Sequence, residues 1–407
     1  MREMKNSGVA WIGEIPEKYS VVAVKNMFEI GRGRVIAKTE LCDDGYPVYS
    51  SQTKNDGCLG YISTYDFDRD QLTWTTDGAN AGTIFLRRGR HNCTNVCGTL
   101  LPKSNDICLE YQRYALWYIA LHHKRADTNG FKIMNNEMAA IKTVVPPTNE
   151  QKKIAFLLDD KCSKVHTLIA NQEAQIEKLK QYKKSLITEV VTKGLNPDVE
   201  MKDSGVEWIG IVNSRFNVQP INALFSIEKR ILGKEPEQVL SITQRGIVPK
   251  DITSNEGQIA NSYAHYQIVN KGDFAMNQMD LLTGGVGISE FEGVTSPDYR
   301  VFVMKNKEMN ARYFLYVFET YYRNKIFYAF GQGAANVGRW RLPAQNFKTI
   351  YIPVPSVSEQ NKIVIYLDDQ CSKIDKLIEI KQSKIAKLNE YKKSLIFEYV
   401  TGKKEVC

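Results

Sequence analysis

The sequence predicts an α+β protein in which two mixed α/β domains are joined by two long helices, with the whole arrangement repeated once. Residues 150–192 and 359–401 are two versions of one helical sequence, identical at 24 of 43 aligned positions with a constant offset of 209 residues. A shorter repeat precedes each half, at Met4–Val21 and Met201–Val218. Because internal repeats define an architecture before any local pattern does, a pseudo-twofold organisation is expected.

The repeats divide the chain into four parts. A first domain with its N-terminal box should occupy residues 1–148, and the first long helix residues 149–193. A linker, the second box and the second domain should occupy residues 194–357, and the second long helix residues 358–403. Each domain is long enough to bury a core of its own.

Between the boxes and the helices, both variable segments show the pattern of strands followed by one helix. In the first segment we expect strands at 46–51, 60–63, 71–76 and 82–86 and a helix at Glu110–His123. In the second we expect strands at 239–243, 265–269, 274–278 and 299–304 and a helix at Ala311–Ala329. A polar loop then leads to each long helix.

The two long helices each carry one apolar stripe, at steps of three, four and seven residues. Helices of this length are not stable alone, so each stripe should pack on the other copy. Thr148 and Ser358 are the expected N-caps, and Gly194 and Gly402 the expected C-terminal stops. The acidic pairs Asp159–Asp160 and Asp368–Asp369 are candidate kink points.

Composition indicates an ordinary soluble protein, with 43% hydrophobic and 25% charged residues. No segment has the apolar length of a membrane span or of a signal peptide, so a cytoplasmic location is expected. A net charge of +8 permits a nucleic-acid partner without requiring one. The eight cysteines contain no CxxC pair, and the cluster of His91, Cys93 and Cys97 is more typical of buried thiols than of a metal site.

Polar loops supply the candidate DNA contacts, because Arg, Asn and Gln can form paired hydrogen bonds with guanine or adenine edges. Loops rich in these residues are also what ordinary turns look like. The candidates are Gln52, Lys54, Asn55, Asn80, Asn129, Lys132, Gln244, Arg245, Gln332, Asn336, Arg339 and Arg341.

The sequence YKKSLI occurs identically in both long helices. It is either a solvated helix face or a docking surface presented twice, and two matching surfaces would recruit two copies of one partner. The candidate docking residues are Tyr182, Lys183, Lys184, Tyr391, Lys392 and Lys393.

Motifs for catalysis are missing from the sequence. There is no phosphate-binding GxxxxGK[ST] loop, and no tetrad of the kind that holds a target base for amino-group methylation. The stretch around Asp298 lacks the second carboxylate of a nuclease motif, and the five histidines are not spaced for a hydrolytic triad. The chain is therefore predicted to be non-catalytic, with no bound metal or cofactor.

In its order of parts, the chain resembles the specificity subunit of type I restriction–modification systems. The residues that carry the resemblance are Glu150–Gln151 and Glu359–Gln360 at the helix starts, each after a proline-containing strand end, and the boxes SGVAWIG and SGVEWIG. The box differs modestly from the family pattern, since Asn213 stands opposite Pro16 and Tyr19 or Phe216 replaces a frequent Trp.

The resemblance implies two target-recognition domains separated by an antiparallel coiled coil, each reading half of a split, asymmetric sequence in double-stranded DNA. It also implies two docked methyltransferase (modification) subunits and restriction (motor-nuclease) subunits. S-adenosylmethionine, ATP and Mg²⁺ would then be bound only by those partners. A rod between two readers suits this task, because half-sites one helical turn apart lie about 34–36 Å from each other. The alternative is a coiled-coil adaptor that binds proteins only, which would leave two dissimilar α/β domains without a task.

Overall fold

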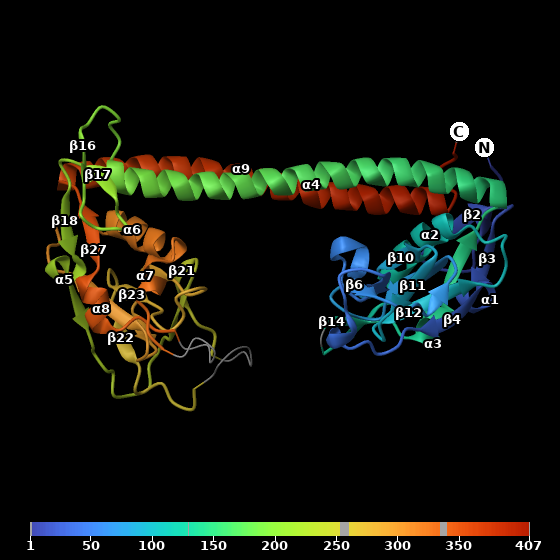
Figure 1. Cartoon of the computed structure of the whole chain (residues 1–407), viewed down its shortest axis with the longest axis horizontal. Coiled ribbons are helices and arrows are strands. Elements are labelled where there is room, and N and C mark those ends of the chain that lie inside the picture. Colours follow the sequence, from blue (N-terminus) through green and yellow to red (C-terminus); the bar gives the residue numbers. More distant parts are fainter. Residues whose placement is uncertain (1, 129, 253–259, 334–339, 407) are drawn as a thin grey trace. The chain divides into compact units, whose positions relative to one another are not determined.

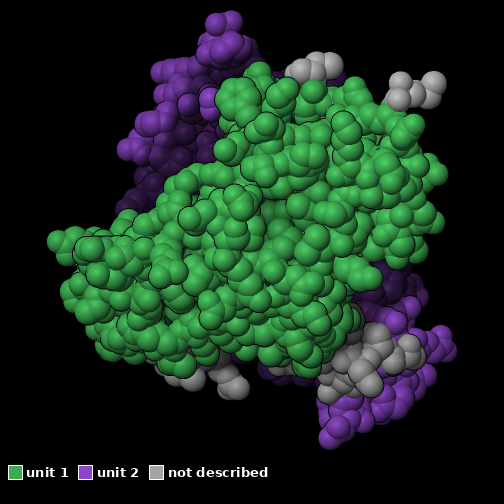
Figure 2. Space-filling model, turned by 90° about the vertical axis from the view of Figure 1, so that its right-hand side faces the viewer, with its two compact units in different colours: residues 1–173, 382–407 green, residues 174–381 purple. Residues whose placement is uncertain are grey.

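The computed structural model describes residues 2–128, 130–252, 260–333 and 340–406 (Figure 1). The chain forms two compact units, which Figure 2 shows in different colours. The first unit consists of residues 1–173 and 382–407, and the second of residues 174–381. Each unit therefore contains one half of each long helix.

The first unit is built on an antiparallel four-stranded sheet with the order β10-β8-β12-β4. These strands are β4 (Phe28–Arg32), β8 (Gln71–Thr75), β10 (Ile84–Arg87) and β12 (Cys97–Pro102). Helix α2 (Leu109–His123) packs on the sheet, and its buried Leu116 and Ile119 share a core with Leu72 and Trp74. The prediction of a helix at Glu110–His123 is confirmed.

The second unit contains the same sheet, in the order β24-β23-β26-β19 and again fully antiparallel. Its strands are β19 (Phe225–Glu228), β23 (Phe274–Met276), β24 (Val286–Ile288) and β26 (Arg300–Met304). Helix α6 (Ala311–Arg323) packs against this sheet through Phe318, whose ring contacts Phe225, Phe274 and Phe302. Aromatic pairs are thus more numerous here than in the core of the first unit, where Phe28 and Trp74 lie among aliphatic side chains.

The smaller elements correspond as well. The first unit has the paired strands β1 (Met4–Asn6) and β2 (Glu14–Pro16), β3 (Ser20–Ala23) and β15 (Lys142–Val145), β5 (Tyr46–Tyr49) and β6 (Cys58–Ile62), and β7 (Phe67–Asp68) and β11 (Arg90–Cys93). The second has, in the same order, β16 (Met201–Asp203) and β17 (Ile211–Asn213), β18 (Asn217–Pro220) and β27 (Tyr351–Val354), β20 (Leu240–Thr243) and β21 (Gly246–Pro249), and β22 (Gln267–Val269) and β25 (Gly293–Thr295). Short helices α1 (Val24–Met27) and α3 (Asn135–Ala140) match α5 (Ile221–Leu224) and α8 (Ala344–Thr349). The eight predicted strands are confirmed in location, and the two variable segments share one fold.

The long helices are α4 (Thr148–Lys193) and α9 (Val357–Val400). In the first unit, the beginning of α4 packs on the end of α9, with Ile154 and Leu158 in one core with Ile396 and Val400. In the second unit, the end of α4 packs in the same way on the beginning of α9. The two helices are therefore antiparallel within each unit. Neither helix is interrupted at its Asp–Asp pair, so the candidate kinks are absent there.

The ends of the long helices correct part of the sequence prediction. Gly194 and Gly402 have φ values of +78° and +71°, as expected of C-terminal stops. The predicted N-caps Thr148 and Ser358 are wrong, because both lie within the first helical turn. The second helix is capped by Ser356 instead, whose hydroxyl oxygen accepts a hydrogen bond from the backbone N–H of Glu359 at 3.3 Å.

Two further predictions are wrong. The expected helix at Ala311–Ala329 is two helices, because Lys325 adopts a left-handed conformation (φ +59°) between α6 and α7 (Ile326–Ala329). The expected polar loop at residues 124–138 contains strands β13 (Arg125–Asp127) and β14 (Gly130–Lys132) and the start of α3. These strands form because β14 pairs with β9 (Asp77–Gly78). Among the described helices, none has the apolar length needed to cross a bilayer.

Candidate nucleic-acid interface

In both units, the loop that leaves the second strand of the sheet meets the polar segment that follows the helix. In the first unit, the backbone N–H of Ile133 donates to the carbonyl of Thr76 at 2.9 Å. In the second unit, the N–H of Leu342 donates to the carbonyl of Gln278, also at 2.9 Å. Ile133 and Leu342 are buried equivalents, 209 residues apart in the chain. In each unit, the loop after the second strand is thus joined to a segment that was predicted to contact DNA.

A buried donor from the sheet fixes this junction in each unit. The indole N–H of Trp74 donates to the carbonyl of Ile133 at 3.0 Å, and the guanidinium of Arg300 donates to the carbonyl of Leu342 at 2.8 Å. Burial lowers the pKa of Arg300 to about 10, so this side chain is still cationic at neutral pH. Trp74 and Arg300 therefore hold the loop junctions of their units by the same kind of hydrogen bond.

In the first unit, the structure brings together two of the predicted segments. Strand β14 pairs with β9, with Lys132 opposite Asp77, so Lys132 lies beside the turn that contains the exposed Asn80. The ammonium of Lys132 forms an ion pair with Asp127 at 3.1 Å within the β13–β14 hairpin. Asn129 lies outside the described residues.

The loop with Gln52, Lys54 and Asn55 is held by contacts to the rest of the first unit. The amide of Gln52 donates to the carbonyl of Cys58, and Asn55 has a φ of +49°. The buried guanidinium of Arg87 ion-pairs with Asp56 at 3.0 Å. Lys54 is exposed and forms no ion pair within the part of the chain that the structure describes. Of the predicted loop residues, Lys54 is therefore the most available to a phosphate.

In the second unit, one loop connects two predicted contact regions. The side-chain amide of Gln244 donates to the carbonyl of Thr283 at 2.9 Å, at one end of the 277–285 loop. At the other end, Gln332 and Arg341 exchange backbone hydrogen bonds of 2.8 and 3.1 Å. The exposed Arg245 lies in the same turn as Gln244. Asn336 and Arg339 lie outside the described residues.

Arg341 also lines a cavity of about 360 Å³ together with Gln278, Tyr299 and Arg300. The cavity volume is about that of a small ligand site. Neither Arg245 nor Arg341 has a carboxylate within ion-pair distance among the described residues. Their guanidinium groups are therefore available for an external anion or base edge.

Sequence reasoning missed two residues at these edges. Arg32, at the end of β4, donates to the hydroxyl of Thr76 at 3.2 Å and to the carbonyl of Asn95. Gln278 was missed because the sequence predicts it as the last residue of the strand at 274–278, whereas strand β23 ends at Met276. The adjacent amides Asn277 and Gln278 directly after a buried strand were the available signal.

The predicted docking residues divide into two groups. Tyr182 and Tyr391 are exposed, at 55% and 53% of their surface. The lysines contact the chain itself: Lys183 ion-pairs with Asp375, and Lys392 donates to His166. Lys184 donates to the carbonyl of Arg323, and Lys393 ion-pairs with Glu390. The tyrosines are therefore the freer half of each patch.

The side chains of His91, Cys93 and Cys97, the cluster considered as a metal site, are buried within the fold. Cys93 and Cys97 are buried, and burial raises the pKa of the Cys97 thiol to about 11. His91 faces the amide of Gln71 at 2.9 Å and the carbonyl of Gly89 at 2.7 Å. Across the described residues, no three His, Cys, Asp or Glu side chains are grouped for a metal ion.

Two copies of one α/β scaffold, each with polar loops at the same edge and each attached to paired long helices, define a duplicated recognition protein. The comparison with protein families gives the same class. The model of the type I restriction modification DNA specificity domain matches residues 16–178 and 239–390. The chain belongs to this family, and DNA binding follows from that membership.

Comparisons with individual proteins point to the same family. A putative type I specificity subunit N-terminus from Mycoplasma pneumoniae is 38% identical over 138 residues, which cover 33% of this chain and 74% of the relative. Matches to further M. pneumoniae specificity subunits span between 38% and 66% of their lengths. A putative type I restriction enzyme specificity subunit from Methanocaldococcus jannaschii is 26% identical over 431 residues, covering 97% of this chain and 96% of the relative.

Among solved structures, a chain from a study of the assembly and conformational transition of the type I R-M system matches with a TM-score of 0.65. The match covers 95% of this chain and 98% of that chain at 11% sequence identity. At this identity the likeness concerns the fold, which is the mixed α/β architecture with long helices described above.

Proposed function

We propose that this chain is the non-catalytic subunit that gives a type I restriction–modification complex its DNA specificity, with each unit reading one half of a bipartite, asymmetric site. The observation that carries the proposal is the repeated order of elements with unlike loops at the same edge. Identical scaffolds would place the two readers equivalently on the duplex, and different loop chemistry would read different bases.

The loop side chains have the chemistry that base reading needs. Arg245 and Arg341 are exposed guanidinium groups in the second unit, and arginine forms the commonest specific contact with guanine. Gln332 and Gln278 lie next to Arg341 and could read adenine. In the first unit, Asn80 and Lys132 share an edge with Arg32. Phosphate contacts by lysines such as Lys54 would position the unit without reading sequence.

We assign residues 1–148 and 194–357 to the two target-recognition domains with their boxes and linker, and residues 149–193 and 358–403 to the connecting helices. The helix halves pack antiparallel in each unit. A continuous antiparallel coiled coil through both units would set a fixed spacing between the half-sites. The number of unread base pairs would then follow from the length of the helices.

We further propose that two methyltransferase subunits dock on matched apolar residues of the long helices. In the first unit, Phe156 is 80% exposed, and its equivalent in the second unit, Ile365, is 71% exposed. Leu168 and Leu377 are likewise exposed to 45% and 46%. Together with Tyr391 and Tyr182, each unit presents the same three positions to solvent. Large exposed apolar groups on both copies indicate one surface used twice.

In this scheme, the methyltransferase subunits bring S-adenosylmethionine and methylate adenine, and the restriction subunits bring ATP-driven cleavage with Mg²⁺. This chain would supply the DNA specificity through its loops. S-adenosylmethionine, ATP and Mg²⁺ would bind to the partner subunits and would need no site on this chain.

A segment exchange tests the proposal. Replacing residues 219–355 with the equivalent segment of a relative should change one half of the methylated sequence in cells that carry the partner subunits. The matched control replaces residues 22–147 and should change the other half. If one exchange altered both halves, the units would not be independent readers.

The protein-only adaptor is the second candidate. Its supporting observation is the set of matched apolar residues on the helices, which needs no DNA. A gel shift with duplex DNA at low salt separates the two, because the adaptor would show no binding to DNA while still capturing the methyltransferase subunits.

A further inference from the structure

Two pockets occupy equivalent places in the two units and differ in the charged residues that line them. Each lies between a long-helix pair and the domain helix of the same unit. The shared lining residues, at a constant offset of 209, are Asp159 and Asp368, Cys162 and Cys371, Ser163 and Ser372, Lys392 and Lys183, and Ile396 and Ile187. Two differences concern the pocket lysine: His166 in the first pocket stands where the second has Asp375, and Trp117 of α2 stands where α6 has Glu319.

The aspartate that ends each pocket is already engaged in both units. In the first, the carboxylate of Asp159 accepts from the hydroxyl of Tyr114 at 2.7 Å and pairs with Arg113. In the second, Asp368 accepts from Tyr316 at 2.5 Å and pairs with Arg312 at 2.8 Å. This carboxylate therefore neutralises the arginine and leaves the pocket lysine to another partner.

The pocket lysines have different partners. In the second pocket, Lys183 donates to both carboxylate oxygens of Asp375, at 2.7 and 2.8 Å. In the first pocket, Lys392 donates to the Nε2 atom of His166 at 2.6 Å. Among the described residues, no carboxylate lies within 4.0 Å of the Lys392 ammonium. The first pocket is thus lined by one carboxylate, that of Asp159, whereas the second is lined by four, those of Glu319, Asp368, Asp375 and Glu379.

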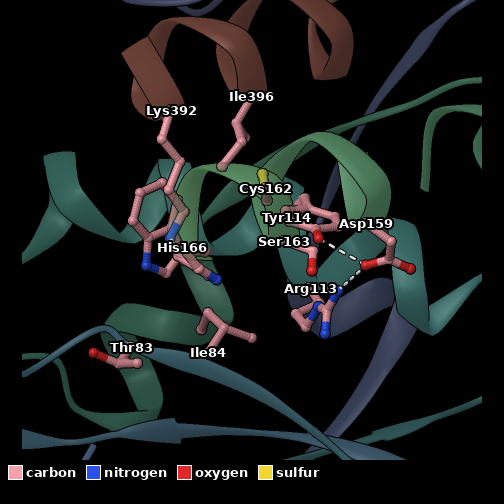
Figure 3. Close-up of a pocket in the computed structure, with 11 residues that line it drawn as sticks. Thr83, Ile84, Arg113, Tyr114, Asp159, Cys162, Ser163, His166, Lys392 and Ile396 are labelled. Carbon is pink, nitrogen blue, oxygen red and sulfur yellow. Dashed lines mark hydrogen bonds and ion pairs between the residues drawn. The ribbon is translucent and has the colours of Figure 1, made fainter. Parts of the chain in front are cut away.

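The first pocket is an unfavourable environment for the positive charge of Lys392, which no described carboxylate neutralises. Burial lowers the pKa of Lys392, and burial together with the cations Lys392 and Arg113 lowers the pKa of His166. The Lys392 ammonium lies 4.9 Å from the centroid of the Trp117 ring, a cation–π contact that attracts the ammonium but supplies no counter-charge. In Figure 3, Lys392 and Ile396 extend from one helix toward His166 and Ser163, with Arg113 below them.

We propose that the first pocket binds a small oxyanion, a carboxylate or phosphate group, which takes the place that Asp375 fills in the second pocket. Lys392 would supply the counter-charge, and the Ser163 hydroxyl and the Arg113 guanidinium would supply further donors at the rim. The cavity, about 350 Å³ in volume, accommodates such a group and a small attached body against Trp117. The second pocket would bind none, because its own carboxylate occupies the site.

The experiment titrates the full chain with inorganic phosphate and, separately, with benzoate by calorimetry, at neutral pH and constant ionic strength. Wild type should bind one equivalent of at least one anion. His166→Asp introduces the aspartate of the second pocket and should weaken binding about tenfold or more, because a like charge now faces the ligand. In the second unit, Asp375→His combined with Glu319→Gln removes both carboxylates that interact with Lys183 and should raise the stoichiometry from one site to two. Comparing the two anions shows whether carboxylate or phosphate is preferred.

Controls separate charge from shape. His166→Gln removes the imidazole without adding a charge and should keep most of the affinity, whereas Lys392→Gln should abolish it. His166→Asp should fold as wild type does, since the second unit already uses that aspartate. The proposal is overturned if neither anion binds to wild type, if His166→Asp binds as tightly as wild type, or if His166→Gln loses affinity as fully as His166→Asp.

Discussion

Gly98 lies directly beneath the indole ring of Trp74, its cross-strand partner in the β8–β12 pair. A Cβ atom built on Gly98 would lie 2.2 Å from that ring, well inside contact distance. The equivalent pair in the second unit is Met276 and Arg300, 202 residues further along the chain. The larger side chain comes from β8 in the first unit (Trp74) and from β26 in the second (Arg300). In both units it donates a hydrogen bond to the backbone carbonyl at the loop junction.

Gly98→Ala should therefore destabilise the first unit, because the extra methyl group cannot fit without displacing the indole. We expect a loss of about 1–3 kcal/mol in the free energy of unfolding, as is typical of overpacked cores. Denaturant unfolding followed by circular dichroism measures it. Combining the change with Trp74→Met should recover part of the loss, and strictly additive effects would show that the ring is not the obstacle.

This exchange explains which part of the fold could be predicted from the sequence. The long helices, the boxes and the strand positions follow from local periodicity and repetition. The shared fold of the two variable segments could not be predicted, because the same space is filled by Trp and Gly in one and by Met and Arg in the other. Compensating changes across strands preserve volume and hydrogen bonds while erasing sequence identity.

The candidate site was predictable in kind and only partly in detail. Several of the amide- and arginine-rich loops meet at one edge of each unit, and their contact with DNA stays a prediction. Which candidate side chains are already paired depends on tertiary contacts that no local pattern contains. One example is the ion pair between Lys183, a candidate docking residue, and Asp375, 192 residues away. The β13–β14 hairpin was missed for the same reason, since its third strand, β9, lies in another loop.

Tyr111 and Tyr313 give the second prediction. The Tyr111 hydroxyl lies 3.0 Å from the carbonyls of Val144 and Val400, and the Tyr313 hydroxyl lies 3.1 and 3.0 Å from those of Val191 and Pro353. Both side chains are fully buried. Each joins a domain to its long helix, so Tyr→Phe at either position should cost about 1–3 kcal/mol by leaving buried carbonyls without a donor. Tyr182→Phe, on an exposed ring, is the matched control and should change the unfolding free energy little.

Arg341 gives the third prediction, which concerns DNA. If its guanidinium reads a guanine, Arg341→Ala should cost about 1–3 kcal/mol of binding and relax one base position in the methylated sequence. If it contacts phosphate, binding should weaken evenly across sequences and the salt dependence should fall by about one unit of slope. Arg245→Ala is the parallel variant in the neighbouring turn. Neither effect in either variant would place the reading surface of the second unit elsewhere.

The fourth prediction concerns pH. The pKa values of His91, His123 and His166 are all lowered in the folded protein, chiefly by burial. A histidine with a lowered folded pKa binds its proton more readily when unfolded, so its contribution to stability is complete above the unfolded value of about 6.5 and is lost as the pH falls. The melting temperature should therefore decrease on acidification from pH 7 toward pH 5. His166→Gln should flatten part of that decrease, and an unchanged profile in the variant would exclude His166 as a contributor.

The last prediction uses the long helices as a ruler. Helices α4 and α9 keep their apolar stripes at steps that sum to seven, so one heptad inserted at equivalent positions in each should preserve the packing between them. Seven residues lengthen a helix by about 10 Å, which corresponds to roughly three base pairs of duplex. If the helices set the distance between half-sites, the lengthened protein should methylate sites with the same two halves and a spacer about three base pairs longer. Sequencing of methylated DNA from cells carrying this variant with its partner subunits measures the spacer. An active variant with an unchanged spacer would show that the helices do not set the distance, and inserting the heptad in only one helix should abolish activity because the stripes would no longer align.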